Sequence, residues 1–356
     1  MRTDRIAVVG GGIIGCLVAR EAARSGAGVT LVDRDLVGLG ASGRSAGVHF
    51  PLGRTERVRA MSAYSQAYYD ALKDALPALP IHPLTLDAAV PVGAAREHHA
   101  RFLHPGRPSA MVAADGRRVP WPDGGTTWRL PGCQVADVGD LVGALVRDLR
   151  DRVAVLEGVR VLAVDEHSSG VTLTLGTGES REFDQVVLCP GPWANADEWG
   201  RYTAGLGIRI KKVVALHVDQ PVDDGDVGVF FPVEDAFLVP VPHRGHWLFS
   251  YTCPEWDVRP DSLHDGLSAA DLARARAVLV RYAPALADRV RGGRVFCDAY
   301  SPAREPLVVP VGATGRVVFA GAANGSGYRL GPAIATAAVQ LLAIHHPSEE
   351  MPSCAS

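Results

Sequence analysis

Residues 5–15 read RIAVVGGGIIG, a short β-branched apolar run that ends in a series of glycines. The run has the composition of a buried strand, and residues 13–25 continue with apolar side chains at helical spacing. Gly10, Gly12 and Gly15 have the spacing of a turn that lets a pyrophosphate approach the backbone and a helix pack on a strand. The free N–H groups and the dipole of that helix would face the phosphates. The pattern predicts a dinucleotide site on a strand–turn–helix unit.

An acidic residue strengthens this interpretation. The next strand is predicted at Val29–Val32, and Asp33 follows it directly. A carboxylate at this place accepts hydrogen bonds from the ribose hydroxyls of adenosine, whereas a 2′-phosphate favours an arginine. Residues 40–47, GASGRSAG, are a second run of small residues, which lets the backbone lie against a long, flat ligand. The glycine fingerprint alone does not separate NAD from FAD.

Length and composition indicate a globular protein of two interlocked domains. The chain has 356 residues, of which 47% are hydrophobic and 21% charged. The formal net charge of −3 provides no general field that would attract nucleic acid or an anionic membrane. Because no long apolar run and no cleavable leader are visible, we expect a cytoplasmic protein without a membrane partner. The sequence leaves homo-oligomerisation open.

Cysteine and histidine spacing argues against metal sites. The cysteines have no C-x-x-C pair, so we expect neither zinc nor a disulfide framework, and the histidine pairs lack a nearby ligand cluster. The residues concerned are Cys16, Cys133, Cys189, Cys253, Cys297, Cys354, His98-His99 and His345-His346.

Capping signals and apolar periodicity predict the remaining elements. Asp137 is expected to begin a helix that ends near Arg150, and Ser268 with Asp271 resembles the capping box of another helix. A last helix is predicted at 331–344. We infer a discontinuous nucleotide domain, with a second, antiparallel-sheet domain inserted into it. The nucleotide domain takes residues 1–76, 134–205 and 298–356, and the substrate domain takes 77–133 and 206–297.

Two further segments give the sequence a family resemblance. Residues 184–193 read DQVVLCPGPW, and residues 319–332 read FAGAANGSGYRLGP. With the fingerprint and residues 40–47, they resemble the flavin-dependent amine and amino-acid oxidases of the D-amino-acid oxidase superfamily, which includes glycine oxidase and sarcosine oxidase. The resemblance implies an α/β protein with a Rossmann-type, glutathione-reductase-like FAD-binding domain and an inserted antiparallel-sheet α+β substrate domain. The implied cofactor is FAD, held without a covalent bond.

The resemblance also implies which residues contact FAD. Residues 324–330 resemble the family's C-terminal loop, whose N–H groups face the flavin N1/O2 edge, and Val155 or a neighbour on its strand would line the adenine. A helix start at this loop would independently place donors where a reduced flavin develops negative charge. The expected cofactor contacts are Gly10, Gly12, Ile13, Ile14, Gly15, Asp33, Arg34, Ser42, Gly43, Arg44, Ser45, Ala46, Gly47, Val155, Pro190, Gly191, Trp193, Asn324, Gly325, Ser326, Gly327, Tyr328, Arg329 and Leu330.

Arg329 is the first candidate for binding a substrate carboxylate. It lies where the sequence resembles sarcosine oxidase, which carries a carboxylate-binding lysine there, and a guanidinium would hold the group bidentately. On ungapped comparison, the two carboxylate-binding arginines of glycine oxidase fall at Ser301 and Gly325, which disfavours free glycine as the substrate. Other candidate cations, three of them near His49 and Phe50, are Arg54, Arg57, Arg59 and Arg304.

Aromatic and sulfur-containing residues complete the expected substrate site. Tyr251, Tyr300 and Tyr328 are candidates to line it, with core packing as the alternative for each. Trp247 or His246 would stand where sarcosine oxidase has the lysine that assists its reaction with oxygen. Cys297 lies near that enzyme's covalent flavin attachment, but its spacing differs by one residue.

These residues favour FAD-dependent oxidation of a glycine-type amine, N-substituted rather than free, to an imine that hydrolyses to glyoxylate and an amine. An N-carboxymethyl amino acid would fit this description, and hydrogen peroxide forms if oxygen is the acceptor. A D-amino acid or a cyclic imino acid is the alternative substrate. A flavin monooxygenase shares the fingerprint, although its usual Gly-Asp pair is replaced here by Gly321-Ala322. A non-catalytic flavin-binding protein is the third interpretation.

Overall fold

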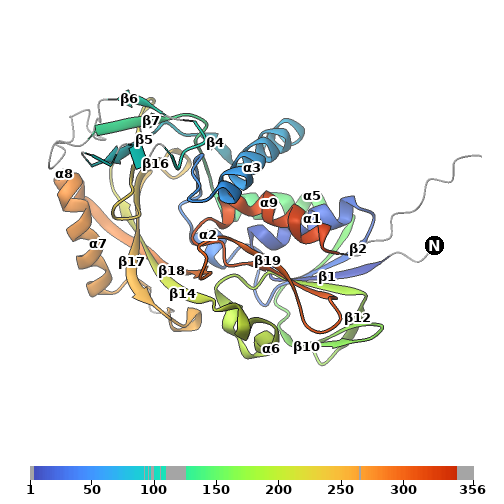
Figure 1. The fold of residues 1–356 in the computed structure, drawn as a ribbon. Helices are drawn as coiled ribbons and strands as arrows, with labels where there is room; N and C mark the ends of the chain where they lie inside the picture. The colour runs from blue at the N-terminus through green and yellow to red at the C-terminus, as the bar shows by residue number, and fades with distance from the viewer. Residues whose placement is uncertain are drawn as a thin grey trace, which may run out of the picture.

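The computed structural model of the protein describes residues 4–342, apart from 92, 95, 98–99, 105, 110–125 and 264–265. The histidine pairs singled out above and Cys354 lie outside the described residues. The other five cysteines are all free thiols. Two large sheets lie side by side in Figure 1.

A six-stranded sheet forms around the fingerprint strand β1 (Arg5–Val9), in the order β19-β20-β13-β1-β2-β9. All neighbours are parallel except β19 and β20. The chain adds strands first on one side of β1 and later on the other, so the topology switches at β1, and ligands of such sheets bind at the carboxyl ends beside the switch. The other strands are β2 (Gly28–Val32), β9 (Val153–Leu156), β13 (Gln185–Leu188), β19 (Leu307–Val311) and β20 (Val317–Gly321).

Both faces of this sheet are covered, which explains why its parallel strands are almost continuously apolar. Helices α1 (Ile13–Arg24), α5 (Val138–Leu149) and α9 (Gly327–Gln340) pack on one face, and α3 (Glu56–Ala75) lies against α9 (Figure 1). The opposite face carries a small antiparallel sheet and short helices, namely β10 (Val161–His167), β11 (Gly170–Leu175), β12 (Ser180–Phe183), η2 (Gly191–Asn195), η3 (Asp197–Trp199), α6 (Gly200–Thr203) and η4 (Ala204–Leu206).

The predicted capping residues are confirmed. The Asp137 carboxylate accepts the N–H of Asp140 at 3.1 Å at the beginning of α5. Ser268 and Asp271 form a capping box at the beginning of α7 (Ala269–Tyr282). Short polar side chains at these positions satisfy N–H groups that the helix itself leaves free.

The predicted beginning of the last helix is wrong. α9 begins at Gly327, not at residue 331, and it runs through Pro332. Proline has no N–H, so the carbonyl of Tyr328 loses its helical donor. The buried hydroxyl of Tyr69 donates to that carbonyl at 2.7 Å. This contact from α3 is a tertiary one, which local sequence could not indicate; the predicted end of the helix lies outside the described residues.

The second sheet has eight strands in the order β18-β14-β17-β16-β15-β5-β7-β6. Only the β5–β15 pair is parallel. Helix α7 covers one face, over Trp247 and Phe249 (Figure 1). The strands are β5 (Leu86–Val90), β6 (Arg107–Ser109), β7 (Thr126–Leu130), β14 (Arg209–Val218), β15 (Gly228–Phe231), β16 (Ala236–Val241), β17 (His246–Trp256) and β18 (Val290–Tyr300).

Strand β18 is an edge strand of this sheet, and its last residues lie beside the carboxyl ends of the first sheet's strands. It runs through residue 298, where the sequence placed a domain boundary, so Asp298 and Tyr300 continue the second sheet. A three-stranded sheet of β3 (Val48–His49), β8 (Gln134–Ala136) and β4 (Ile81–Pro83) lies between the larger parts. Among the described residues, no helix has both the length and the apolar character that crossing a membrane requires.

Candidate active site

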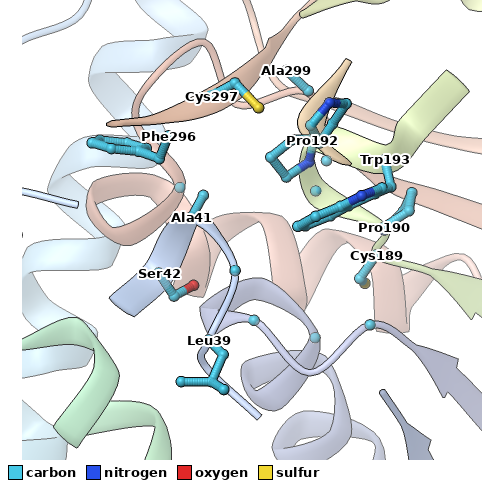
Figure 2. A pocket seen from close by; sticks show the side chains of 18 of the residues that line it. Leu39, Ala41, Ser42, Cys189, Pro190, Pro192, Trp193, Phe296, Cys297 and Ala299 are labelled. Atoms are coloured by element: carbon cyan, nitrogen blue, oxygen red, sulfur yellow. The ribbon is translucent and has the colours of Figure 1, made fainter. Parts of the chain in front are cut away.

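A cavity of about 540 Å³ lies at the carboxyl ends of the parallel strands, and β18 closes its far side. This volume is in the range of ligand sites. Figure 2 shows the side chains of β18 across from the segment after β2, with the segment after β13 on a third side. The labelled residues on these three sides are Phe296, Cys297 and Ala299; Leu39, Ala41 and Ser42; and Cys189, Pro190, Pro192 and Trp193.

The glycine turn after β1 leaves backbone donors free at one wall of the cavity. Gly10 has a φ of +105°, and a β-carbon on Gly15 would overlap the Gly10 carbonyl oxygen. Helix α1 has no side-chain cap from Gly12 and no acidic residue in its first turn. The Ser42 hydroxyl accepts the N–H of Ile13 at 3.0 Å. The beginning of α1 therefore offers N–H groups and a positive dipole end to an anion.

Asp33 is fixed beside this turn. One carboxylate oxygen accepts the N–H of Gly11 at 2.6 Å, and the other accepts the N–H of Asp35 at 2.8 Å. Burial raises the pKa of Asp33, while these two backbone donors oppose the shift. The carboxylate lines the cavity. Its remaining lone pairs can accept ribose hydroxyls, as the sequence predicted.

A contact between three segments far apart in the sequence closes over this end of the cavity. The Arg34 guanidinium lies 4.1 Å from the centroid of the Trp193 ring. Asp261, in η6 (Pro260–Ser262) between β17 and α7, pairs with Arg34 at 2.6 Å and accepts the indole N–H of Trp193 at 2.8 Å. We call these three residues the clasp. All three line the cavity.

The opposite end of the cavity is bounded by a strained turn before α9. Ala322 and Asn324 have positive φ values of 48° and 54°, which cost energy for residues with a β-carbon. The N–H of Asn324 donates to Ala299 at 3.1 Å, and its side-chain oxygen accepts the N–H of Ser301 at 3.1 Å. The turn is therefore fastened to the end of β18. Gly325, the next residue, has a φ of +76° and lines the cavity.

Arg329 is buried behind this turn. Its guanidinium donates to the Leu52 carbonyl and, at 2.7 Å, to the Ser326 hydroxyl, and it lies 4.8 Å from the centroid of the Phe50 ring. Burial lowers its pKa to about 10. It forms no ion pair within 4.0 Å with any residue that the structure describes. The charge of Asp235 opposes this shift in pKa from beyond ion-pair distance. A buried cation whose near partners are neutral acceptors is costly, so a ligand anion beside the guanidinium would be stabilised.

Asp298 is a candidate that the sequence interpretation missed. It lies on β18 and lines the cavity, and burial together with the charge of Asp235 raises its pKa to about 7. In the part of the chain that is described, it has no hydrogen-bond or ion-pair partner. The signal was present in the sequence: residues 294–300, RVFCDAY, contain one acidic residue inside an otherwise apolar strand segment.

The three candidate tyrosines have different environments. The Tyr300 hydroxyl faces Gly325, where a β-carbon would lie 3.2 Å from it. Tyr251 packs with the cluster under α7, on the face of the sheet that points away from the cavity. Tyr328 is a core residue, whose ring lies 4.8 Å from that of Tyr69 and whose hydroxyl accepts an N–H of Gln134 at 3.2 Å. Tyr251 and Tyr328 therefore do not line this cavity, and the structure gives both the alternative role of packing.

His49 and Arg54 are not placed to contact a ligand in this cavity. His49 is fully buried, and burial together with the charge of Arg329 lowers its pKa to about 3, so the ring stays neutral. It is not among the residues that line the cavity. Arg54 is exposed. The sequence brought both close to the site along the chain, but the His49 side chain lies in the core, whereas the Arg54 side chain is exposed.

The expected oxygen-reactive and covalent positions also differ from the structure. Trp247 is buried under α7, so it cannot face a flavin in the cavity. His246 lies on the other side of the strand, with its ring centroid 4.9 Å from that of His217. Cys297 lines the cavity, but burial raises the pKa of its thiol to about 12, which disfavours the thiolate needed for attachment.

The expected cofactor contacts divide into two groups. The first group lines the cavity and comprises Gly10, Gly12, Ile13, Ile14, Gly15, Asp33, Arg34, Ser42, Arg44, Pro190, Gly191, Trp193, Gly325 and Gly327. The second group lies behind that lining and comprises Gly43, Ser45, Ala46, Gly47, Val155, Asn324, Ser326, Tyr328, Arg329 and Leu330. Val155 packs against the core under the helices, and Val159 and Val161 line the cavity instead. Most of the second group shapes the turns that carry the first.

Comparison with known proteins identifies the family. A family model described as FAD dependent oxidoreductase matches residues 5–341, so the chain belongs to this family. The predicted fold and family are therefore confirmed, and FAD is the cofactor. The glycine oxidase of Pseudomonas aeruginosa (strain PAO1) is 42% identical over 73 residues, which span 20% of this chain and only 20% of that protein.

Solved structures show the same fold over nearly the whole chain. Glycine oxidase from Geobacillus kaustophilus has a TM-score of 0.77 at 18% identity and covers 96% of this chain and 97% of its own. L-proline dehydrogenase from P. horikoshii has a TM-score of 0.76 at 16% identity, with 96% and 93% covered. Amadoriase I from Aspergillus fumigatus, a fructosyl amine:oxygen oxidoreductase, has a TM-score of 0.73 at 19% identity, with 96% and 86% covered.

The cavity suits FAD on its own terms. Side chains are excluded by the backbone at Gly10 and Gly15, free N–H groups lie at the beginning of α1, and a fixed carboxylate stands at Asp33. These features match a pyrophosphate and a ribose. The clasp covers that end, and the turn before α9 places helix N–H groups at the other.

Proposed function

We propose that the protein oxidises the bond between the α-carbon and the nitrogen of an amino acid, with an N-substituted glycine as the preferred substrate. The product is an imine that hydrolyses to glyoxylate and an amine. The observation that carries the proposal is the buried Arg329 guanidinium, which has no ion pair within 4.0 Å among the described residues, although the charge of Asp235 acts on it from farther away. A substrate carboxylate would supply that charge.

FAD, when bound, supplies the hydride acceptor, so the protein's own task is to orient the substrate. Arg329 does not itself line the cavity, so it would hold a carboxylate that reaches past Gly325, which does, and would thereby fix the α-carbon. The Ser326 hydroxyl and the Leu52 carbonyl keep the guanidinium in place from two sides. The dipole of α9 would stabilise negative charge that develops at the adjoining turn.

An aromatic wall beside Arg329 supports a substituent on the substrate nitrogen. The ring of Phe50, over which the guanidinium lies, has its centroid 5.1 Å from that of Phe230 and 5.3 Å from that of Phe237. Phe50 and Phe230 are buried core residues and none of the three rings lines the cavity, so only the partly exposed Phe237 offers apolar surface to a substrate larger than glycine. The proteins with a similar fold include both a fructosyl amine oxidoreductase and an L-proline dehydrogenase, so the screen below compares N-substituted glycines with L-proline.

An anaerobic reduction screen tests the proposal. The purified yellow protein is mixed with glycine, N-alkylglycines, D-amino acids and L-proline, and bleaching of the flavin absorbance is followed. We expect N-alkylglycines to bleach the flavin fastest. Faster reduction by D-amino acids or L-proline would replace the preferred substrate, and no bleaching by any of them would contradict the proposal. NADPH consumption coupled to hydroxylation would instead indicate a monooxygenase.

A further inference from the structure

Asp298 is a partly buried acid at the same turn as Arg329. Its Oδ2 atom lies 3.8 Å from the place where a β-carbon on Gly325 would stand, and the Tyr300 hydroxyl lies 3.2 Å from the same place. Arg329 reaches the next residue of that turn, Ser326, at 2.7 Å. A carboxylic acid and a guanidinium cation, each without an ion-pair partner among the described residues, therefore approach the same turn before α9.

The chain contains a cation that could neutralise Asp298 but does not. Lys211 lies directly opposite Asp298 in the register of β14 and β18. Its ammonium group instead lies 4.9 Å from the centroid of the Trp256 ring and 5.7 Å from that of Tyr300. These aromatic faces attract the ammonium group and draw it away from the carboxylate. Asp298 thus lines the cavity without an ion pair among the described residues, although Lys211 stands opposite it on the neighbouring strand.

The other groups around Asp298 do not supply a positive charge. On β18 its neighbours are the thiol of Cys297 and the phenol of Tyr300, and the turn between β15 and β16 contributes the carboxylate of Asp235. Residues 324–327 of the facing turn contain no titratable side chain. The charge of Arg304 acts on Tyr300 and that of Arg44 on Cys297, but neither forms an ion pair with Asp298 among the described residues.

We propose that Asp298 binds the positively charged amino group of the substrate, so that the substrate is an amino acid held at both of its opposite charges. This inference rests on the proposed function, because Arg329 must hold the carboxylate at the other end. It narrows the substrate class: the nitrogen must be basic enough to enter the site protonated, which includes primary and secondary amines and excludes amides and acylated amino acids.

The pH dependence follows from the chemistry of the acid. Only the ionised carboxylate attracts a cation, and the pKa of Asp298 is raised to about 7 by burial and by Asp235. Affinity for an ammonium ligand should therefore fall as the pH drops from 8 to 6. Affinity for a carboxylate ligand without an amino group should not follow this profile.

Two acids of nearly equal shape separate the two charges. 2-Aminoisobutyrate carries a carboxylate and an ammonium group, whereas pivalate carries a methyl group in place of the ammonium group. Neither has an α-hydrogen, so neither can be oxidised at the α-carbon, and binding to the FAD-loaded protein is read from the change in flavin absorbance. We expect the wild type at pH 8 to bind 2-aminoisobutyrate about tenfold or more tightly than pivalate.

Two matched variants test whether Asp298 causes the preference for 2-aminoisobutyrate over pivalate. Asp298→Asn should abolish the preference and leave pivalate binding unchanged, whereas Lys211→Met should keep the wild-type preference. Retention of the preference in Asp298→Asn, its loss in Lys211→Met, or equal affinity of the wild type for both acids would overturn the inference while leaving the carboxylate site at Arg329 intact. A wild type that binds neither acid would overturn the proposed function itself. The pH profile of the wild type provides the same test if the asparagine variant does not fold.

Discussion

The two ends of the cavity differ in whether their charged side chains have partners within the protein. At the end formed by the turn after β1, the Asp33 carboxylate accepts two backbone N–H groups, and Arg34 pairs with Asp261. At the other end, Arg329 and Asp298 have no ion-pair partner in the described part of the chain. The two charges without an ion pair thus lie at the end where we propose that the substrate binds, although Arg329 keeps its hydrogen bonds to Leu52 and Ser326.

The difference also appears in the backbone. The cofactor end uses glycines, which adopt positive φ at little cost, as Gly10 does. The end bounded by the turn before α9, where we expect the flavin ring, is the redox end. Its turn uses Ala322 and Asn324 at positive φ, where a β-carbon is strained. Strain and unpaired charge together reduce stability, so the fold must tolerate both for the sake of the site. The comparison predicts that mutations at the first end remove FAD, whereas mutations at the second end change substrate binding and stability.

The largest effect is expected from Gly15→Ala. The added β-carbon would overlap the Gly10 carbonyl oxygen, so α1 must move away from β1 and the pyrophosphate site is lost. We expect purified protein without bound flavin, measured by absorbance after denaturation. Gly143→Ala in α5 is the matched control, because its β-carbon meets only the end of the Arg147 side chain at 3.5 Å. Wild-type flavin content in Gly15→Ala would contradict the assignment.

Arg329→Met should leave FAD in place and impair substrate binding. Methionine keeps the packing on Phe50 but removes the charge, so kcat/KM should fall by roughly a hundredfold or more. The measurement is steady-state turnover with the best substrate of the anaerobic screen. Arg54→Met, which removes an exposed guanidinium on the adjoining loop, should keep kcat/KM within twofold of the wild type. Equal losses in both variants would show a general effect of charge.

Asp298→Asn should stabilise the protein at alkaline pH. The folded pKa of about 7 lies above the value of about 3.9 in an unfolded chain, so the stability contributed by the protonated acid is present below pH 4 and lost as the pH rises through 7. The variant should therefore unfold with a free energy on the order of 1–2 kcal/mol higher than the wild type at pH 8. The two proteins should coincide near pH 4. Denaturant unfolding at both values checks this, and a difference that is independent of pH would refute it.

The smallest effect is expected at the clasp. Asp261→Asn removes the ion pair with Arg34 but preserves an acceptor for the Trp193 indole N–H. Because the pair is partly exposed, the loss should raise the FAD dissociation constant only about two- to fivefold. The effect should shrink at high salt, since salt screens the pair. FAD titration of the apoprotein at low and high ionic strength measures both values.

The cofactor end could be predicted from the sequence because its chemistry is local. The glycines, Asp33 and the capping residues Asp137 and Ser268 act within a few positions of where they stand, so spacing reveals them. The whole of α9 could not be predicted, because the hydroxyl that supports it at Pro332 comes from α3.

The redox end could be predicted only in part, because strands alternate their side chains between two faces. Tyr251 and Trp247 were aromatic and near the expected site along the chain, yet both face α7. Asp298 faces the cavity, but which face is inward depends on how β18 packs beside the first sheet. Arg329 was identified through a family resemblance. That it lacks an ion pair among the described residues depends on the tertiary structure and could not be seen in the sequence.

A crystal structure of the FAD-loaded protein with 2-aminoisobutyrate tests the central claim most directly. We predict a ligand whose carboxylate lies about 3 Å from the Arg329 guanidinium and whose nitrogen lies about 3 Å from the Asp298 carboxylate. A ligand bound elsewhere, or a cofactor group that itself pairs with Arg329 and Asp298, would contradict the claim that these two charges await an amino acid.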